Sequence, residues 1–390
     1  MPTFYNYTED GQVRSIDDVF VPADAFRQGG LFTWGDNTYA YLGVNDTNRR
    51  CTPVTTSAGG ANWKQVACGT YHVSAIKTDG TLWTWGYNDT GQLGINVAGS
   101  TTYRTTPVTT FAGGTNWKQV ACGAFHTVAI KTDGTLWTWG YNFGGELGIN
   151  ATGTRCTPVT TFAGGANWKQ VSCANGHTEA IKTDGTLWVW GGNGGQLGTN
   201  DTNTRCTPVT TFAGGTNWKQ VFCGYNHTAA IKTDGTLWTW GQNSYGQLGI
   251  NATGTRCTPV TTFAGGANWK QVGTRTYQTA AIKTDGTLWN WGGNDNGYLG
   301  INVTGNRCTP VTTFAGGTNW KQVAVGFNHM AAIKTDGTLW TWGRNFGALG
   351  DNTTTNRSTP VTTFAGGTNW KQVACGQGFS LAVTYIDDYQ

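Results

Sequence analysis

Short segments of alternating apolar and polar residues recur along most of this chain. One unit contains Thr157–Phe162 (TPVTTF), Asn167–Cys173 (NWKQVSC), His177–Thr183 (HTEAIKT) and Thr186–Gly191 (TLWVWG). Each segment is rich in Val, Thr, Ile and Trp and is bounded by Gly, Asn or Asp, which is typical of β-strands. No segment shows a helical period of useful length. The pattern therefore predicts an all-β fold with four strands in every unit.

The unit returns at a nearly constant interval. Its segment NWKQV occurs seven times, at Trp63, Trp117, Trp168, Trp218, Trp269, Trp320 and Trp370. A period of about 40–50 residues with several strands per unit is typical of propeller blades. The spacing therefore predicts a seven-bladed β-propeller built of four-stranded antiparallel blades.

The two ends of the repeat region complement each other. Residues 31–56 supply only an LFTWG strand and a TPVTT strand, whereas residues 370–386 supply only WKQVACG and FSLAVTYI. Two N-terminal and two C-terminal strands would complete one blade and close the ring without an open face between blades. We therefore expect residues 31–390 to form one propeller and residues 1–30, which match no repeat, to form a separate N-terminal arm.

The residue types also predict where each strand lies in a blade. Pro158, near the start of TPVTTF, favours the outermost strand, because proline cannot donate to a neighbouring strand. The small residues of Val-Ala-Cys-Gly favour the innermost strand, where the blades crowd the axis. All 20 Trp lie in NWKQV segments or in LWTWG segments and their variants, so we expect their rings to form the core between blades.

The composition argues against several classes of protein. Charged residues make up 12% of the chain, the net charge is +4, and the Lys and Arg residues are spread over the repeats without a basic tail. This distribution argues against nucleic-acid binding. No run of about 18 apolar residues is present, which argues against membrane insertion, and the first residues lack the apolar core of a signal peptide.

Two stretches carry a resemblance to a known family. WGYNDTGQLG (Trp85–Gly94), VACGTYHVSAIKTDGTLWTWG (Val66–Gly86) and their copies resemble the regulator of chromosome condensation repeat family. The resemblance covers residues 31–386 and recurs seven times. It implies a seven-bladed propeller whose termini share a blade, and a His with a structural role at the start of one strand. It implies little about activity, since one fold hosts many functions.

The His and Cys residues follow the repeat, so we expect them to have structural roles and not to form a reactive site. Five His share one repeat position, which spreads them around the ring: His72, His126, His177, His227 and His329. A metal site needs three or four converging ligands, so we expect none. The ten Cys occupy two repeat positions, one before Thr-Pro-Val and one at the end of the NWKQV strand. Several units have Cys at only one of the two positions, so the two do not form a conserved pair. This pattern predicts free thiols and a reducing cytoplasm. No catalytic constellation stands out, so we expect no cofactor and no enzyme activity.

Variation between units is confined to one class of connection. The connections AGGTNW and KTDGT are nearly constant, whereas the other two connections of each unit are rich in Tyr, Phe, Asn and Gly. Alternate connections of a blade share one face of the disc, so the variable residues should gather on a single face. The candidate binding residues there are Tyr39, Tyr41, Tyr71, Tyr87, Phe125, Tyr141, Phe143, Tyr225, Tyr245, Tyr277, Tyr298, Phe327, Arg344 and Phe346. Loops on a rigid scaffold often bind ligands, although sequence drift on an unused face is the alternative.

These observations favour a non-enzymatic binding or structural module that recognises a protein or a glycan through this face. Near-identical repeats behind a short unrelated leader resemble virion-associated proteins of bacteriophages, which implies attachment to a virion tail or capsid. Residues 1–30 would then anchor the chain to other virion proteins, through Val19, Phe20, Val21 and Phe26. The alternative is a protein-binding regulator or inhibitor, of the exchange-factor or inhibitor type, built on the same propeller.

Two other activities of the family are less well supported by the residues. Nucleotide exchange on a small GTPase and chromatin binding, as in the founding member, imply a protruding wedge and a basic tail, and the sequence has neither. Light sensing, as in plant members with a tryptophan cluster, implies G-W-R-H-T motifs, whereas Gly273-Thr274-Arg275-Thr276 lacks the Trp.

Overall fold

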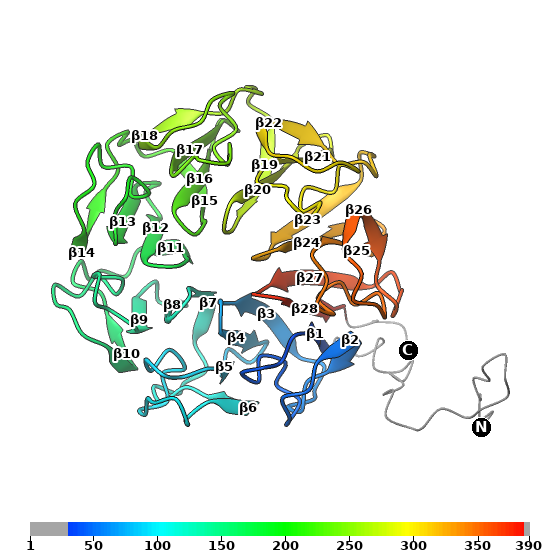
Figure 1. Ribbon diagram of the computed structural model, residues 1–390. Helices are drawn as coiled ribbons and strands as arrows, with labels where there is room; N and C mark the ends of the chain where they lie inside the picture. The colour runs from blue at the N-terminus through cyan, green and yellow to red at the C-terminus, as the bar shows by residue number, and fades with distance from the viewer. Residues whose placement is uncertain (1–29, 386–390) are drawn as a thin grey trace, which may run out of the picture.

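The fold is a closed ring of seven blades (Figure 1). The computed structural model describes residues 30–385, and these contain 28 strands in seven four-stranded sheets. Neighbouring strands within each sheet are antiparallel. The predicted seven-bladed, all-β propeller is therefore confirmed. Within the described residues, no helix is long and apolar enough to cross a membrane. The predicted arm and its anchor residues Val19, Phe20, Val21 and Phe26 lie outside the described residues.

In each blade the strand that begins at the NWKQV tryptophan lies nearest the axis, and the next three strands follow outward. The innermost strands are β3 (Trp63–Cys68), β7 (Trp117–Cys122), β11 (Trp168–Cys173), β15 (Trp218–Cys223), β19 (Trp269–Thr274), β23 (Trp320–Val325) and β27 (Trp370–Cys375). The second strands are β4 (His72–Lys77), β8 (His126–Lys131), β12 (His177–Lys182), β16 (His227–Lys232), β20 (Gln278–Lys283), β24 (His329–Lys334) and β28 (Phe379–Thr384).

The two outer strands of each blade carry the second tryptophan motif and the TPVT segment. The third strands are β1 (Leu31–Gly35), β5 (Leu82–Gly86), β9 (Leu136–Gly140), β13 (Leu187–Gly191), β17 (Leu237–Gly241), β21 (Leu288–Gly292) and β25 (Leu339–Gly343). The outermost strands are β2 (Arg50–Thr55), β6 (Arg104–Thr109), β10 (Arg155–Thr160), β14 (Arg205–Thr210), β18 (Arg256–Thr261), β22 (Arg307–Thr312) and β26 (Arg357–Thr362).

One blade is shared by the first and last strands, as the sequence predicts. β1 pairs with β28, with Leu31 opposite Val383 and Gly35 opposite Phe379. The strand order of this sheet is β2-β1-β28-β27. In Figure 1 the blue first strands and the red last strands lie side by side. The ring is therefore closed by hydrogen bonds between strands and not by a continuous chain.

Fourteen of the 20 tryptophans form the core between blades. They are the NWKQV tryptophans together with Trp34, Trp85, Trp139, Trp190, Trp240, Trp291 and Trp342, and each is at most 2% exposed. Trp139 Nε1 donates to the carbonyl of Gln92 in the preceding blade at 2.9 Å, and Trp34 Nε1 donates to Ala348 in the same way at 2.8 Å. Each third-strand ring thus fills the space between two blades and also satisfies a buried carbonyl of the preceding blade. The NWKQV rings donate instead to a Gly carbonyl of their own loop, as Trp63 Nε1 does to Gly59 at 3.1 Å.

The remaining six tryptophans are only partly buried, which corrects the prediction that all 20 belong to the core. In β9, Trp137 is half-buried, whereas Trp139 is fully buried. The ammonium of Lys131 lies 4.4 Å from the ring centroid of Trp137 and 4.8 Å from that of Trp117. Cation–π contacts of this kind recur in six blades, so these rings cover the blade edge and hold a lysine there.

Glutamine side chains join the innermost strands of neighbouring blades. Gln65 Nε2 donates to the carbonyl of Val120 at 3.0 Å, and Val120 N donates back to Gln65 Oε1 at 3.2 Å. The same pair of bonds links Gln372 to Val66 across the closing blade. The innermost strands of neighbouring blades belong to different sheets, so they share no backbone hydrogen bonds between strands. The Gln side-chain amides satisfy these backbone groups instead.

The five His also join neighbouring blades, in agreement with the structural role that the family resemblance implies. His72 Nε2 lies 2.7 Å from Thr127 Oγ1, and His126 Nε2 lies 2.9 Å from Thr178 Oγ1. Burial lowers the pKa of His72 and His126 to about 3, so both rings are neutral at pH 7. The histidines are thus fixed elements of the blade interface.

Candidate binding face

The variable connections lie together on one face of the ring. Tyr71 lies in the variable connection before β4, and Tyr87 lies in the variable connection after β5. The two connections are adjacent, since Tyr87 N donates to the carbonyl of Tyr71 at 2.9 Å. The constant connections meet at the other ends of the strands, where Trp117 N donates to Gly80 at 3.0 Å and Thr78 N to Asn62 at 2.7 Å. We call the two faces the variable face and the constant face.

Six of the predicted aromatic residues form a continuous row across three adjacent blades, which we call the aromatic arc. Its members are Tyr39, Tyr71, Tyr87, Phe125, Tyr141 and Phe143. Ring centroids are 5.0 Å apart for Tyr39 and Tyr87 and 5.1 Å apart for Tyr71 and Phe125. Phe143 is 64% exposed and Tyr39 is 41% exposed. The arc therefore presents aromatic surface to solvent while its rings support one another in edge and tilted contacts.

The other predicted residues form smaller groups outside the arc. Tyr245 lies 4.5 Å from Tyr277 between ring centroids, and Tyr225 lies 6.3 Å from Phe327. The predicted residues Arg344 and Phe346 form a cation–π pair, in which the guanidinium carbon lies 4.3 Å from the ring centroid. The structure thus places the candidate residues in several contacting groups, of which the arc is the largest.

Two of the candidate residues do not reach solvent. Tyr41 is 3% exposed and stacks on Phe379 at 4.6 Å, and Tyr298 is 8% exposed. The carbonyl of Tyr298 accepts a hydrogen bond from Trp342 Nε1 at 3.0 Å. Both tyrosines occupy the repeat position of Gln92, Gln196 and Gln247, which are at most 7% exposed. Alignment of Tyr-Leu-Gly with Gln-Leu-Gly would have identified them as core residues.

A hollow of about 380 Å³ adjoins the arc at the closing blade. Tyr39 and Tyr71 form part of its wall, together with Arg49, Arg344 and Phe346. The guanidinium carbon of Arg49 lies 5.9 Å from the Phe346 ring centroid. The carboxylate of Asp36 also lines the hollow, so the two arginines leave it with a net positive charge, which suits an anionic group of a ligand. Sequence reasoning missed Arg49, although it is an additional Arg immediately before the Arg that starts each outermost strand.

Arg275 closes part of the central channel beneath the variable face. Its Nη1 lies 3.4 Å from the carbonyl of Cys68, 207 residues away, and its Nη2 lies 3.4 Å from Thr70 Oγ1. The equivalent positions in the other blades hold Gly or Ala, so only this blade can span the channel with a side chain. Burial lowers the pKa of Arg275 below its ordinary value. The sequence shows this residue as a departure from the repeat but cannot show what it contacts.

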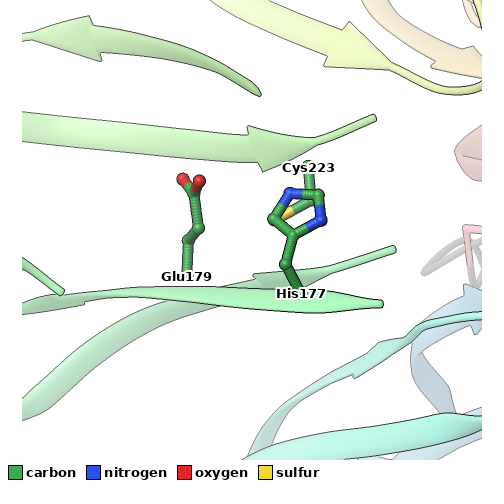
Figure 2. A group of neighbouring side chains, drawn as sticks. All are labelled: His177, Glu179 and Cys223. Atoms are coloured by element: carbon green, nitrogen blue, oxygen red, sulfur yellow. The ribbon is translucent and has the colours of Figure 1, made fainter. Parts of the chain in front are cut away.

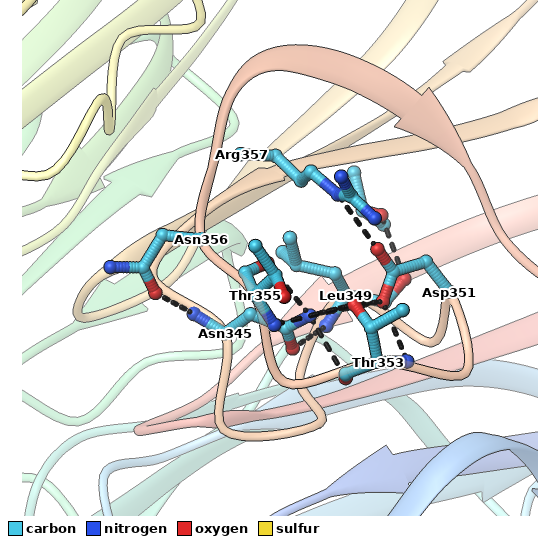
Figure 3. A network of polar contacts seen from close by, with 8 residues as sticks. Asn345, Leu349, Asp351, Thr353, Thr355, Asn356 and Arg357 are labelled. Carbon is cyan, nitrogen blue, oxygen red and sulfur yellow. Dashed lines mark hydrogen bonds and ion pairs between the residues drawn. The ribbon is translucent and has the colours of Figure 1, made fainter.

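The variable loops are organised from within by a buried Asn. In the β25–β26 loop, Asn345 Nδ2 donates to Asp351 Oδ1 at 2.9 Å, and Asn345 Oδ1 accepts from Leu349 N at 3.3 Å. Arg357 Nε donates to Asp351 Oδ2 at 3.0 Å and ties the loop to β26 (Figure 3). The equivalent buried residues are Asn37, Asn88, Asn142, Asn243 and Asn294. The aromatic rings are therefore carried by loops with a fixed internal structure.

A set of phenylalanines that sequence reasoning did not single out follows the outermost strands, beside the Gly-Gly loops of the constant face. These residues are 63–67% exposed and are Phe111, Phe162, Phe212, Phe263, Phe314 and Phe364. Their identity in six blades marks them as part of the repeat. They provide matched controls for substitutions of aromatic residues on the variable face.

All ten cysteines are free. Those at the ends of the innermost strands are buried, and burial raises the pKa of the Cys122 thiol to about 11 and that of Cys375 to about 12. Burial also raises the pKa of the Glu179 carboxyl well above its ordinary value. Glu179 is fully buried, and sequence reasoning missed it although it is the one acidic residue at this position of the repeat.

Comparison with known proteins identifies the family. A model of the RCC1-like domain matches residues 109–388, and models of the regulator of chromosome condensation (RCC1) repeat match residues 28–76, 79–130 and 63–92. The ultraviolet-B receptor UVR8 of Arabidopsis thaliana is 32% identical over 360 residues, which cover 88% of this chain and 68% of the receptor. The X-linked retinitis pigmentosa GTPase regulator homolog of Caenorhabditis elegans is 27% identical over 81% of this chain, and the match spans 22% of that protein.

Solved structures share the same architecture. Human WBSCR16 superposes with a TM-score of 0.81 at 21% identity, over 91% of this chain and all of that one. Prp20p of Saccharomyces cerevisiae gives a TM-score of 0.80 at 19% identity, over 95% of this chain and 93% of that one. At these identities the likeness shows the fold alone, whereas the family model and the plant receptor match most of the chain in sequence. The chain therefore belongs to the regulator of chromosome condensation (RCC1) repeat family.

Proposed function

We propose that this chain is a non-enzymatic regulatory module that binds a protein partner through the variable face. The observation that carries the proposal is the aromatic arc, a row of partly exposed rings that spans three blades beside a hollow with two Arg residues. Protein interfaces are enriched in Tyr, Phe and Arg, and a few such residues supply most of the binding energy.

The loop structure supports the same proposal. The internal hydrogen bonds of Asn345 and Asp351 hold one variable loop in a single arrangement before any partner arrives. A preorganised surface loses less conformational entropy on binding than a flexible one. Arg49 and Arg344 lie at the edge of the arc, so an acidic side chain of the partner is the best match to the hollow.

The relatives favour a regulator over a virion component. UVR8 is named as a receptor, the nematode relative as a GTPase regulator homolog, and the Prp20p structure was described together with binding to Gsp1p and histones. The virion-associated role and the glycan ligand that the sequence favoured have no support in these relatives. A protein-binding regulator, the alternative at that point, is therefore our proposed function.

The arc can be tested with a matched pair of variants. The triple variant Tyr39→Ala, Tyr71→Ala and Phe143→Ala removes three rings of the arc. Aromatic residues at the centre of an interface each contribute about 2 kcal/mol or more, and their contributions are not additive, so we expect the affinity for the partner to fall at least ~100-fold. The partner is identified by affinity capture with the wild-type protein, and its Kd for each variant is then measured by calorimetry.

The control for this experiment carries the same number of ring deletions on the constant face. The triple variant of Phe162, Phe212 and Phe263 to Ala should bind the partner within about 2-fold of the wild-type affinity. Equal losses in both triple variants, or a loss confined to the control, would contradict the proposal. Binding to a glycan array that the arc variant abolishes would favour a carbohydrate ligand instead.

The two arginines of the hollow should control the rate of association. We expect the double variant Arg49→Ala and Arg344→Ala to bind about 10-fold more slowly at low salt and to lose most of the salt dependence of the association rate. Surface plasmon resonance over a series of salt concentrations measures both effects. Lys118→Ala with Lys169→Ala removes the same charge from exposed positions elsewhere. An equal effect of the lysine variant would exclude a local role for the hollow.

A further inference from the structure

Glu179 departs from the repeat in a way that has an energetic cost. It lies in β12 and is fully buried. The equivalent residues of the other blades are small or apolar: Ser74, Val128, Ala229, Ala280, Ala331 and Leu381. Burial of a carboxyl group is unfavourable unless its oxygens are bonded or a cation lies nearby. The chain thus keeps a costly side chain at a position where alanine fits in three other blades.

Glu179 lies beside two other side chains that bind metal ions. The ligand atoms of His177, Glu179 and Cys223 all lie within 4.8 Å of one another, and all three residues are buried. His177 and Glu179 are two residues apart on β12, so both point from the same side of the strand. Cys223 ends β15 of the next blade, and Figure 2 shows its side chain next to the His177 ring.

Two buried atoms of this cluster have no hydrogen-bond partner. Thr228 Oγ1 donates to Glu179 Oε1 at 2.6 Å, which holds the carboxyl group in place. The second oxygen, Glu179 Oε2, is buried without a partner, and so is His177 Nδ1. The Nδ1 atoms of the other four histidines are unpartnered in the same way, so the carboxyl oxygen is the atom that distinguishes this cluster. Buried polar atoms in folded proteins are nearly always bonded, so Glu179 Oε2 requires an explanation.

We propose that His177, Glu179 and Cys223 form a binding site for a divalent cation of the zinc class. An imidazole nitrogen, a carboxylate oxygen and a thiolate sulfur are ligands that zinc prefers, whereas calcium and magnesium prefer oxygen alone. Ligand atoms around a tetrahedral zinc lie about 3.3–3.8 Å apart, given metal–ligand bonds of about 2.0–2.3 Å. The ligand atoms of the cluster lie within 4.8 Å of one another, so each distance must shorten by no more than about 1.5 Å to reach that geometry.

The position of the site defines its effect. His177 and Glu179 belong to the blade of β11–β14, and Cys223 belongs to the blade of β15–β18. A bound ion would join these two blades directly and stabilise their interface. Cys223 is also part of the wall of the central channel, which gives an ion a route to the site.

The neighbouring interface supplies a natural control. His126 and Cys173 occupy the positions of His177 and Cys223 there, but Val128 replaces the carboxylate. Val128 and Cys173 pack in the same buried cluster. The two interfaces thus share the His and the Cys and differ in the ligand that Glu179 supplies.

The test is a titration of reduced, chelator-treated protein with Co²⁺ as a spectroscopic probe, followed by Zn²⁺. We expect one Co²⁺ per chain with a near-ultraviolet sulfur-to-cobalt band, which Zn²⁺ abolishes. Glu179→Ala and Cys223→Ser should each weaken binding at least ~10-fold, whereas Cys173→Ser should leave it unchanged. Zn²⁺ should raise the Tm of the wild-type protein and leave that of Glu179→Ala unchanged.

The opposite substitution extends the test. Val128→Glu should complete a second set with His126 and Cys173 and raise the stoichiometry to two Co²⁺ per chain. The proposal is overturned if the wild-type protein shows no sulfur-to-cobalt band, if Glu179→Ala binds the ion as tightly as the wild type, or if Cys173→Ser weakens binding as much as Cys223→Ser.

Discussion

Acidification from pH 7 to pH 4 is expected to unfold the propeller cooperatively, because five buried His must stay neutral in the folded state. Burial lowers the pKa of His72, His126, His177 and His227 to about 3 and that of His329 to about 4. In the unfolded chain these groups take up protons below their ordinary value of about 6.5. Urea unfolding at a series of pH values, followed by tryptophan fluorescence, measures the effect.

The sign and size of this dependence follow from proton linkage. Between about pH 4 and pH 6.5 the unfolded chain binds more protons than the folded protein, so the free energy of unfolding falls as the pH falls. Five such groups give a limiting slope of about 7 kcal/mol per pH unit. The raised pKa values of Glu146 and Glu179 act in the opposite direction above about pH 4.5, but these are only two groups.

A natural substitution provides the control for the acid effect. Gln278 occupies the His position in one blade, so His126→Gln should preserve the fold. It should reduce the slope of stability against pH by about 1.4 kcal/mol per pH unit, because one proton fewer is taken up on unfolding. An unchanged slope in this variant would show that the histidines do not cause the acid transition.

Trp139→Ala is expected to lower the free energy of unfolding by about 3–5 kcal/mol, the usual cost of removing a large ring from a packed core. The ring is fully buried between two blades, and its Nε1 bonds to the carbonyl of Gln92. The substitution would therefore leave a cavity and an unpartnered carbonyl. Urea unfolding at pH 7 provides the measurement.

Trp137→Ala is the matched control, since it removes the same ring two residues earlier in β9. Trp137 is only partly buried and its Nε1 bonds locally to Thr135 Oγ1 at 2.9 Å. We expect about half the loss seen for Trp139→Ala or less, because less apolar area is removed from contact. Equal losses would mean that both rings contribute equally to the interface and that exposure is a poor guide to their roles.

The sequence predicts the architecture well because the same strand pattern is repeated in every blade. The interval between NWKQV segments gives the number of blades, and the complementary ends predict that the first and last strands share one sheet, in which Leu31 pairs with Val383. The different exposures of Trp137 and Trp139 could not be predicted in the same way. Both side chains lie on the same side of β9, because they are two residues apart. They differ only in their position along the strand, which the repeat pattern does not relate to exposure.

The candidate site is less predictable, because it depends on residues that differ from their repeat equivalents. Such departures are visible in the sequence, as Arg49, Glu179 and Arg275 show. What each of them meets is not visible, since Arg275 reaches Cys68 across the ring and Glu179 meets Cys223 from the next blade. A repeated sequence thus predicts the contacts that are the same in every blade. It does not predict the contacts of a residue that is found in only one blade.

The shared blade has a consequence for synthesis on the ribosome. β1 is the first of the described strands to leave the exit tunnel, but its partner β28 is the last of them to be made. Six blades can assemble during translation, while the edge of β1 must stay unpaired until Phe379–Thr384 emerges. Slow translation of the final segment would prolong the lifetime of that open edge, and with it the opportunity for two nascent chains to pair with each other.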